Sequence, residues 1–535
     1  MDFFRECKRQ SLFLLFFFLG STLFQPVSAT ELIRPSEPES YTASEDSLII
    51  VGLEEMVVSA QRIPVLRSEA LRSVRVIDRT WIENSPAQDI TELISMVQSV
   101  DIRHRGTFGM QSDVSIRGGT FDQTLVLLNG INVTDPQTGH HTLNLPVDLG
   151  SIERIEVLHG PAARVFGPNA FQGAINIITR EPGKKETGIA VTGGSHRFLT
   201  GSAYSGAETG AFSHFLSVTG LTSDGFTENT DFRSGNVFLR SMYRHASGRL
   251  DLQAGFNEKA FGANSFYTPR FPDQFEQTRS TFVSLRWHPD TSLRLTPTVY
   301  WRRHNDRFEL FRGEAPSWYD THNYHQTDVF GASLNWVHVG RWGTGSIGLD
   351  YRYEHIYSNV LGKERSSPRR VRGYDEVYFT HSHGREGLSL MFEYNTAVGA
   401  LNISSGTLLY LHSELEDAVT FFPGLDVGYT FHPELLWYAS LNRTLRLPTF
   451  TDLFYEGPDN VGNPELQPEE AVSFETGFRF NRNMLNMDIA FFRRWGTQMI
   501  DWVRQPGDDY WQSENLTKVT LSGVEAGFTI YAPGR

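Results

Sequence analysis

The sequence predicts a small mixed α+β domain followed by an antiparallel transmembrane β-barrel. Short apolar runs around tight glycine turns fill residues 112–180, and apolar and polar residues alternate with a period of two after Arg180. The composition agrees with this prediction. Only 39% of the 535 residues are hydrophobic, which is too polar for a bundle of membrane helices, whereas 47 glycines and 13% aromatic residues are typical of β-rich proteins.

The N-terminus predicts a secretory signal peptide over residues 1–29. Basic residues precede an apolar run and a small-residue cleavage site, namely Arg5, Lys8, Arg9, the run at 12–19, and Val27-Ser28-Ala29. The rival interpretation is a membrane anchor, but the run is too short to span a bilayer comfortably. The only cysteine, Cys7, lies inside this segment, so the mature protein cannot rely on disulfides or cysteine-ligated metal.

Residues 61–182 have the pattern of the mixed domain. Asn129-Gly130 stands between two apolar runs, which indicates a hairpin because both turn positions need a positive φ. Upstream, the spacing predicts a helix with Ser85 as N-cap and Pro86 in its first turn. Its apolar face would consist of Ile90, Leu93, Ile94 and Val97.

Residues 187–535 alternate in the manner of membrane-crossing strands about ten residues long. Apolar residues face one side in each of five such runs: 250–256, 293–301, 330–336, 435–441 and 524–530. Charged residues on the opposite face fit a wet lumen, and Trp or Tyr near the strand ends fit an aromatic girdle. The strands of a soluble β-sandwich would also alternate between apolar and polar residues. A sandwich would not need charged residues on one face in strand after strand, or Trp and Tyr near the strand ends.

The connections between these strands are unequal in length. Tight turns are expected at 246–248 and 432–433, and long loops at 257–277, 303–325 and 361–374. Short turns on one side and long loops on the other are the outer-membrane arrangement, with the long loops outside. Long loops are also where binding residues usually lie.

Two sets of motifs resemble TonB-dependent outer-membrane receptors. The first set matches the family's plug domain and consists of Ile116-Arg117-Gly118, Leu127-Leu128-Asn129-Gly130, Ile152 to Val157, Gly160-Pro161 and Ile175-Asn176-Ile177-Ile178-Thr179. The second set resembles the late barrel of vitamin B12 and iron-siderophore transporters, from Arg446-Leu447-Pro448 through Gly462-Asn463-Pro464 to Glu475-Thr476-Gly477. His159, Pro168 and Gln172 depart from the family pattern in local turns.

The resemblance implies a plug inside a 22-stranded barrel. By alternation we count roughly 17 strands from Thr187 onward, and the last residues, Ala532-Pro533-Gly534-Arg535, have the pattern of a turn. We therefore expect the barrel to be incomplete in this chain, truncated at its C-terminus, with about five strands missing.

The resemblance also implies an energy-coupling segment near the N-terminus. Residues 30–51 are rich in Glu, Ser and Pro and are expected to form a flexible periplasmic tether. Residues 52–60 follow, and the family's TonB box is matched by Glu54, Glu55, Met56, Val57, Val58 and Ser59. An extended strand on a tether can add to a sheet of a TonB-type periplasmic energy transducer. The alternative is that Val57-Val58 is the first plug strand.

In the family, the upper loops of the plug touch the ligand. Carried over to this sequence, the first candidate set is Thr107, Phe108, Gly109, Met110 and Gln111, and the second, within 132–144, includes Asn132, Asp135, His140, His141 and Asn144. The alternative is that these loops only pack against the barrel.

The sequence gives no sign of an enzyme, a cofactor or a metal site. No nucleophile-elbow motif is present. His140-His141 and His381-Ser382-His383 lack an obvious third ligand, and Asn305-Asp306 and Asp508-Asp509 lack the dense oxygen spacing of a calcium loop. The formal net charge of −14 argues against a nucleic acid partner.

Together these observations predict a Gram-negative outer-membrane receptor in contact with lipid, with residues 54–59 in the periplasm. Its expected function is energy-coupled uptake of a scarce small molecule, either a corrinoid such as vitamin B12 or another metal chelate such as an iron-siderophore. The alternative is a binding or signalling receptor without transport.

Overall fold

The structure is a computed structural model that describes residues 57–58, 63, 65–66, 70–106, 108–183, 185–290, 294–319, 321–417, 419–457, 459–482 and 484–530. All of them lie in one compact unit, Glu55–Arg535. The predicted signal peptide, the tether and Glu54, Glu55, Met56 and Ser59 of the predicted coupling segment lie outside the described residues, as does the predicted terminal turn.

An inner domain, residues 70–183, is built on a five-stranded sheet in the order β3-β8-β9-β6-β7, in which only the β6–β9 pair is parallel. Its strands are β3 (Val74–Ile77), β4 (Val100–Arg105), β5 (Gln111–Ile116), β6 (Thr124–Leu128), β7 (Ile131–Asn132), β8 (Ile152–His159) and β9 (Gly173–Thr179). Its helices are α2 (Arg79–Asn84), α3 (Ile90–Ser95), α4 (Ala163–Phe166) and the 3₁₀ turns η3 (Phe121–Gln123), η4 (Gly139–His141) and η5 (Leu149–Ser151). Before this domain, β1 (Val57–Val58) pairs with β2 (Val65–Leu66).

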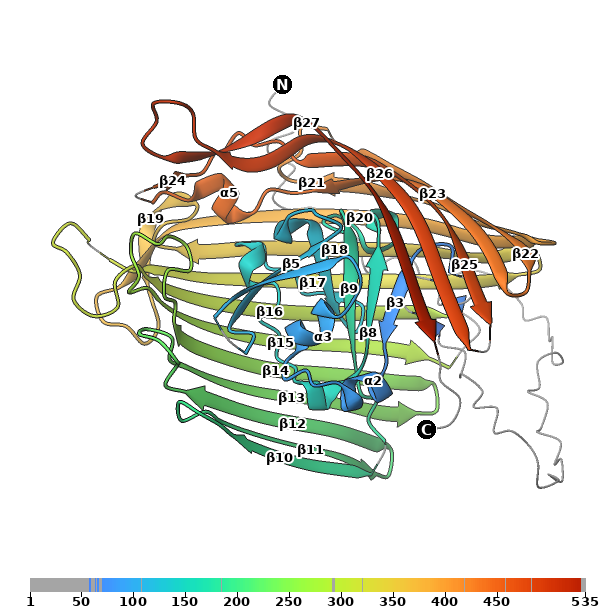
Figure 1. The fold of residues 1–535 in the computed structure, drawn as a ribbon, viewed down its shortest axis with the longest axis horizontal. Coiled ribbons are helices and arrows are strands. Elements are labelled where there is room, and N and C mark those ends of the chain that lie inside the picture. The colour runs from blue at the N-terminus through green and yellow to red at the C-terminus, as the bar shows by residue number, and fades with distance from the viewer. Residues whose placement is uncertain are drawn as a thin grey trace, which may run out of the picture. The chain divides into compact units, whose positions relative to one another are not determined.

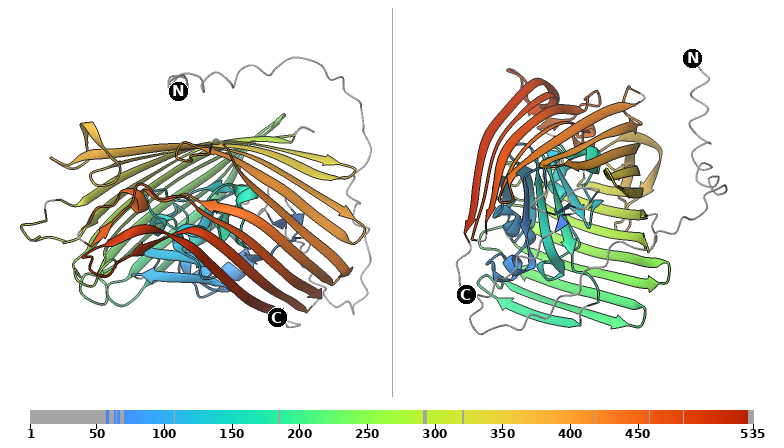
Figure 2. Two further views of the ribbon diagram at one scale, coloured as in Figure 1. Left: turned by 90° about the horizontal axis from the view of Figure 1, so that it is seen from above. Right: turned by 90° about the vertical axis from the view of Figure 1, so that its right-hand side faces the viewer.

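A second sheet, the barrel sheet, curves around the inner domain (Figures 1 and 2). Its 18 strands are almost all joined as an antiparallel meander: β10 (Glu186–Gly193), β11 (Leu199–Thr209), β12 (Phe212–Ser223), β13 (Phe232–His245), β14 (Gly248–Gly262), β15 (Phe275–Pro289), β16 (Leu295–Glu309), β17 (Asn323–Gly340), β18 (Gly343–Ser358), β19 (Lys363–Arg370), β20 (Tyr378–Val398), β21 (Leu401–His412), β22 (Thr420–His432), β23 (Leu435–Arg446), β24 (Asn460–Val461), β25 (Glu469–Arg482), β26 (Leu485–Val503) and β27 (Trp511–Ile530). A short helix, α5 (Phe450–Phe454), follows β23.

The two faces of the barrel sheet divide as the alternation predicts. In β14, Leu252 and Phe256 are 37% and 42% exposed, whereas Asp251 and Gln253 are fully buried. The same division holds in β27, where Val524 and Phe528 are exposed and Glu525 is buried. Apolar side chains therefore point outward, and polar side chains point to the inner domain.

Most strands of the barrel sheet are longer than the predicted ten residues, and the loops between them are correspondingly shorter. β14 and β15 each have 15 residues, so the loop between them spans only 263–274. The predicted loop at 361–374 contains strand β19, which pairs with β20. The extra length continues the polar and apolar alternation beyond the ten residues that a bilayer requires.

The barrel sheet has 18 strands, compared with the roughly 17 expected from alternation, and one of the 18 is the two-residue β24, which pairs with β27 in parallel. Among the residues that the structure describes, β10 and β27 form no ladder with each other and are the two ends of the sheet order. The number of strands in the complete protein stays a prediction.

The predicted start of the plug helix, with Ser85 as its N-cap, was wrong. The chain forms two short helices, α2 and α3, and Ser85 is the C-cap of the first. Helix α3 begins at Ile90 because the Asp89 carboxylate accepts hydrogen bonds from the backbone N–H groups of Thr91 and Glu92. The predicted apolar face is correct, since Leu93, Ile94 and Val97 are buried. No helix in the described ranges is long and apolar enough to cross a membrane.

Other local predictions are confirmed. Asn129 and Gly130 both have a positive φ, 51° and 78°, and join β6 to β7 as the hairpin signal indicates. Short turns at 246–247 and 433–434 and loops at 263–274 and 310–322 alternate along the barrel sheet. The loops lie at the left-hand end of the sheet in Figure 1.

Inner-domain arginines form buried ion pairs with carboxylates on strands β22 to β27. Arg117, whose backbone has a φ of 52°, contacts Glu475 on β25 and Glu525 on β27, the latter at 2.7 Å. Arg72 and Arg164 share the carboxylate of Asp426 on β22. These ion pairs attach the inner domain to the last strands of the barrel sheet, β22 to β27.

A different group of strands, β14 to β18, carries basic residues that donate hydrogen bonds to backbone carbonyls of the inner domain. Lys259 Nζ lies 2.6 Å from the carbonyl oxygen of Gly109, and Arg286 Nη2 lies 2.9 Å from that of Asn129. Arg352 donates to the carbonyls of Asn132 and Thr134. The barrel therefore satisfies loop carbonyls that would otherwise be buried without partners.

We predict that Arg117→Ala loosens the inner domain. The change leaves Glu475 and Glu525 buried without their cation, and breaking a buried pair in this way costs roughly 3–5 kcal/mol. In purified, detergent-solubilised protein, trypsin should cleave the inner domain at a lower temperature than in the wild type. Arg103→Ala is the matched control, because the Arg103–Asp101 pair is exposed and such pairs contribute about 1 kcal/mol or less. Equal trypsin resistance of the Arg117 variant and the wild type would contradict the prediction.

Candidate functional site

A hollow opens between an inner-domain loop and the long loops of the barrel sheet. Its volume is about 460 Å³, and its lining is Gly106, Met110, Phe226, Thr227, Thr230, Phe232, Phe261, Gly262, Asn264 and Phe266. Gly106 has a φ of 78°, and a Cβ there would lie 2.9 Å from the Phe266 ring, so this close approach requires glycine. The volume lies within the range of small-molecule sites.

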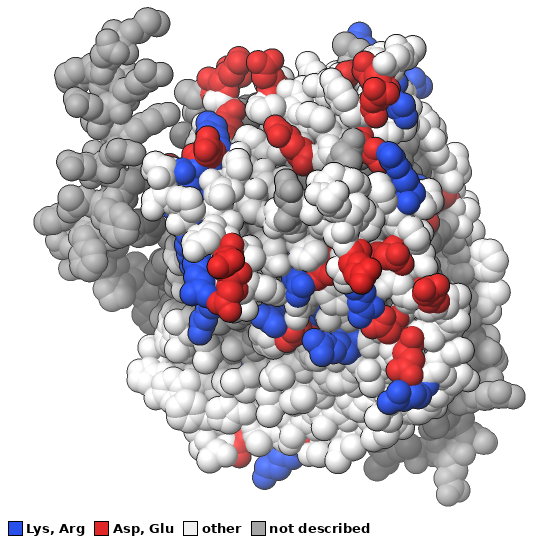
Figure 3. Space-filling view, turned by 90° about the vertical axis from the view of Figure 1, so that its left-hand side faces the viewer, with Lys and Arg blue, Asp and Glu red and all other residues white. Residues whose placement is uncertain are grey.

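Aromatic rings gather on the neighbouring loops. Phe271, Phe311 and Trp318 pack edge to face or tilted, with ring centroids 5.2 to 6.1 Å apart. Trp318 and Phe226 are more than half exposed, so their rings are open to contact from solvent. Figure 3 looks at this end of the protein and shows acidic and basic side chains intermingled on its upper and middle parts.

The first predicted set of ligand residues lies beside the hollow, but most of its side chains already have partners. Phe108 stacks on Phe198 at 4.4 Å between ring centroids, and the Gln111 amide donates to the Tyr267 hydroxyl at 2.7 Å. Met110 is buried and forms part of the lining, and Gly109 accepts from Lys259. Thr107 lies outside the described residues.

The second predicted set packs against barrel strands. Asp135 is buried between Arg302 and His304 of β16, at 2.9 Å from each. Asn144 is buried, with its amide 3.5 Å from the Thr278 hydroxyl. Asn132 caps the backbone N–H of Thr134. These residues and the hollow are therefore separate, and the structure does not bring the second set into the hollow.

The adjacent histidines of η4 have different surroundings. His140 Nδ1 lies 2.6 Å from Asp113 Oδ1, and burial lowers the pKa of His140 despite this contact. Burial also acts to lower the pKa of His141, but the nearby carboxylates of Asp306 and Glu276 outweigh it and raise that pKa to about 9. His141 is thus the more strongly cationic of the two.

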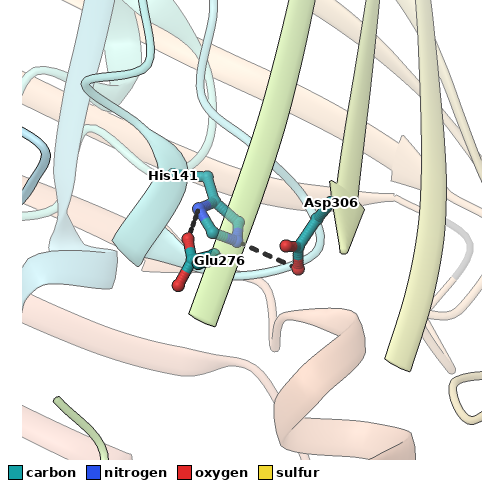
Figure 4. Close-up of side chains that lie close together, drawn as sticks. All are labelled: His141, Glu276 and Asp306. Carbon is teal, nitrogen blue, oxygen red and sulfur yellow. Dashed lines mark hydrogen bonds and ion pairs between the residues drawn. The ribbon is translucent and has the colours of Figure 1, made fainter. Parts of the chain in front are cut away.

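Within the part of the chain that the structure describes, His141, Glu276 and Asp306 are a group that could hold a metal ion, since their donor atoms lie within 4.8 Å of one another. His141 comes from η4, and the carboxylates come from β15 and β16 (Figure 4). Asn305-Asp306 therefore belongs to a strand and not to a calcium loop.

Sequence reasoning missed most of the residues that line the hollow. Phe226, Phe232, Phe261 and Phe266 come from two separate loop regions of the barrel sheet. The available signal was the presence of these phenylalanines in and beside the loops 224–231 and 263–274.

Comparison with known proteins identifies the family. The family model described as "TonB dependent receptor-like, beta-barrel" matches residues 190–531, and the model "TonB-dependent Receptor Plug Domain" matches residues 67–174. The chain belongs to the TonB-dependent receptor family. The inner domain is its plug, and the protein is an outer-membrane receptor for ligand uptake in a family of transport receptors.

Individual relatives agree with this assignment. The chain is 23% identical over 496 residues to a vitamin B12 transporter of Vibrio vulnificus, covering 88% of this chain and 75% of the relative. It is 24% identical over 503 residues to the vitamin B12 transporter of Photobacterium profundum, and the match covers 88% of this chain and 76% of that relative. Among solved structures, a ferric enterobactin receptor mutant of Pseudomonas aeruginosa matches with a TM-score of 0.67 at 17% identity. The match covers 88% of this chain and 79% of that structure's chain.

We predict that Phe226→Ala weakens ligand binding. Phe226 lines the hollow and is 62% exposed, so a bound ligand would cover its ring. Burying a Phe side chain contributes roughly 1.5–3 kcal/mol, so affinity should fall roughly tenfold to a hundredfold. Phe431→Ala, a similarly exposed phenylalanine near the short turn 433–434, is the control for general effects. Unchanged affinity in the Phe226 variant would exclude the hollow from the ligand site.

Proposed function

We propose that this receptor takes up a corrinoid by energy-coupled transport across the outer membrane. The observation that carries the proposal is the hollow of about 460 Å³ between the plug and the barrel loops, because its four phenylalanines can contact an apolar face of a ligand that extends beyond the hollow. The vitamin B12 transporters among its relatives support the corrinoid.

The second candidate ligand is a ferric siderophore. Structural neighbours include receptors for ferric enterobactin, and the exposed loops combine aromatic rings with guanidinium groups. Arg312 stacks at 4.7 Å over the ring of Phe275, and Arg270 at 5.2 Å over that of Phe271. Such surfaces attract anionic aromatic ligands. Arg312 is already paired with Asp231, which weakens this candidate.

Residues 54–59 would be the segment through which a TonB-type transducer supplies the energy for transport. Among the residues that the structure describes, β1 pairs with β2 alone, through Val57 with Leu66 and Val58 with Val65, and lies outside the plug sheet. A ladder of two residue pairs can be exchanged for pairing with a strand of a TonB-type transducer at small cost. The placement of β1 outside the plug sheet supports the coupling role over the alternative of a first plug strand.

Binding measurements would distinguish the ligands. We expect purified receptor to bind cyanocobalamin with submicromolar affinity, and to bind members of a ferric siderophore panel at least tenfold more weakly. The measurement is equilibrium binding in detergent, with the Phe226→Ala variant as the control for binding at the hollow. Tight siderophore binding without cobalamin binding would replace the corrinoid by the second candidate.

We predict that Val57→Pro abolishes uptake while ligand binding and plug folding persist. Proline removes a backbone donor from the strand that would pair with the transducer, and β1 contributes nothing to the five-stranded plug sheet. Ala43→Pro in the predicted tether is the matched control and should transport normally. Uptake of labelled ligand by whole cells gives the readout.

Deleting residues 54–59 extends this test to the alternative of a receptor without transport. An energy-coupled transporter should lose uptake and keep surface binding. If the wild type binds ligand but accumulates none in energised cells, the receptor has a binding or signalling function instead.

A further inference from the structure

Three side chains from separate segments converge where η4 of the plug meets the barrel sheet. His141 Nε2 lies 3.3 Å from Asp306 Oδ2, and His141 Nδ1 lies 3.7 Å from Glu276 Oε1 (Figure 4). All three residues are buried, with exposed fractions of 2%, 1% and 6% for His141, Glu276 and Asp306. No feature of the ligand hollow uses them, because none of the three lines it.

The carboxylates of this cluster are incompletely satisfied. Each has one oxygen in an ordinary hydrogen bond: Tyr267 donates to Glu276 Oε2 at 2.7 Å, and Gln137 donates to Asp306 Oδ2 at 2.8 Å. The other oxygens, Glu276 Oε1 and Asp306 Oδ1, are buried and have no hydrogen-bond partner. Buried carboxylate oxygens without partners are costly, so a bound cation would relieve them.

The donor set and spacing suit a transition-metal ion. One imidazole nitrogen with two carboxylates is a combination that Zn²⁺ accepts, at roughly 2.0–2.2 Å from each donor. Donors around a tetrahedral ion then stand roughly 3.4 Å apart, which small side-chain rotations can reach from the present separations of less than 4.8 Å. A further imidazole, that of His304, lies with its ring centroid 4.6 Å from that of His141.

From this geometry we propose that His141, Glu276 and Asp306 bind a divalent cation of the Zn²⁺ class that fastens the plug to the barrel. The burial of all three donors admits a bare ion and excludes a bulky chelate, so the site is distinct from that of the transported ligand. The ion joins η4 to strands β15 and β16 and holds this part of the plug in place. Its presence does not depend on which ligand the receptor transports.

The alternative occupant of the same space is a proton on His141. The imidazolium would then form ion pairs with both carboxylates, and no metal would be needed. The two occupants make opposite predictions for metal retention, so direct measurement distinguishes them.

The test uses full-length receptor purified in detergent, stripped with a chelator, reloaded with ZnCl₂ alone and dialysed. Elemental analysis should find one retained Zn²⁺ per wild-type chain and none in His141→Gln or in Glu276→Gln/Asp306→Asn. The control His381→Gln changes a histidine on β20 outside this cluster and should retain the ion. Zn²⁺ should also raise the melting temperature of the wild type and of the control, but not that of the site variants.

X-ray absorption at the zinc edge of the wild type tests the ligand set even if a site variant fails to fold. We expect a single shell of nitrogen and oxygen donors with scattering from an imidazole. Absence of retained Zn²⁺ in the wild type would establish the imidazolium as the occupant and overturn the proposal. Equal retention by the wild type and folded site variants would overturn it as well, because the ion would then be bound elsewhere.

Discussion

Charges buried between the plug and the barrel sheet govern how the two parts of this receptor are joined. The contacts include ion pairs such as Arg117 with Glu475 and Glu525 and hydrogen bonds from barrel cations to plug carbonyls, beside apolar packing of barrel phenylalanines on the plug core. Removing one partner of a buried pair is costly, whereas hydrating both partners is not, because water replaces the lost contact. Water that enters the interface can take the place of these polar contacts, whereas it does not compensate for apolar surfaces that are separated.

The architecture was predictable because a membrane-spanning strand must alternate. Lipid on one side of the sheet and a polar lumen on the other require apolar and polar residues to alternate along each strand. Buried Asp251 next to exposed Leu252 is one instance of this alternation in the barrel sheet. The hairpin at Asn129-Gly130 was equally accessible, since positive φ at two successive residues is a local requirement. The start of α3 was not predictable, because Ser85 and Asp89 are both good N-caps and only tertiary packing selects between them.

The candidate sites were predictable only in part. Of the plug-loop residues that the family resemblance indicated, Met110 lines the hollow, whereas the second set packs against barrel strands. The phenylalanines of the hollow, however, come from distant loops, and Glu276 and Asp306 come from two barrel strands. Spacing along the chain cannot reveal such groups, because they meet only when the plug is inside the barrel. For the same reason His141 lacked a visible third ligand in the sequence.

The distribution of charge around the plug also specifies its angular orientation. The plug presents arginines to carboxylates of β22, β25 and β27, and it presents Asp135 and loop carbonyls to basic residues of β14 to β18. On β15 and β16 the carboxylates of Glu276 and Asp306 face His141, and on β25 Arg479 donates to the carbonyls of Ala70 and Arg72. A plug turned about the barrel axis would separate Arg117 from Glu475 and Glu525, and Arg72 and Arg164 from Asp426. Buried charges would then be left without their partners, which is costly, so the ion pairs favour a single orientation of the plug within the barrel sheet.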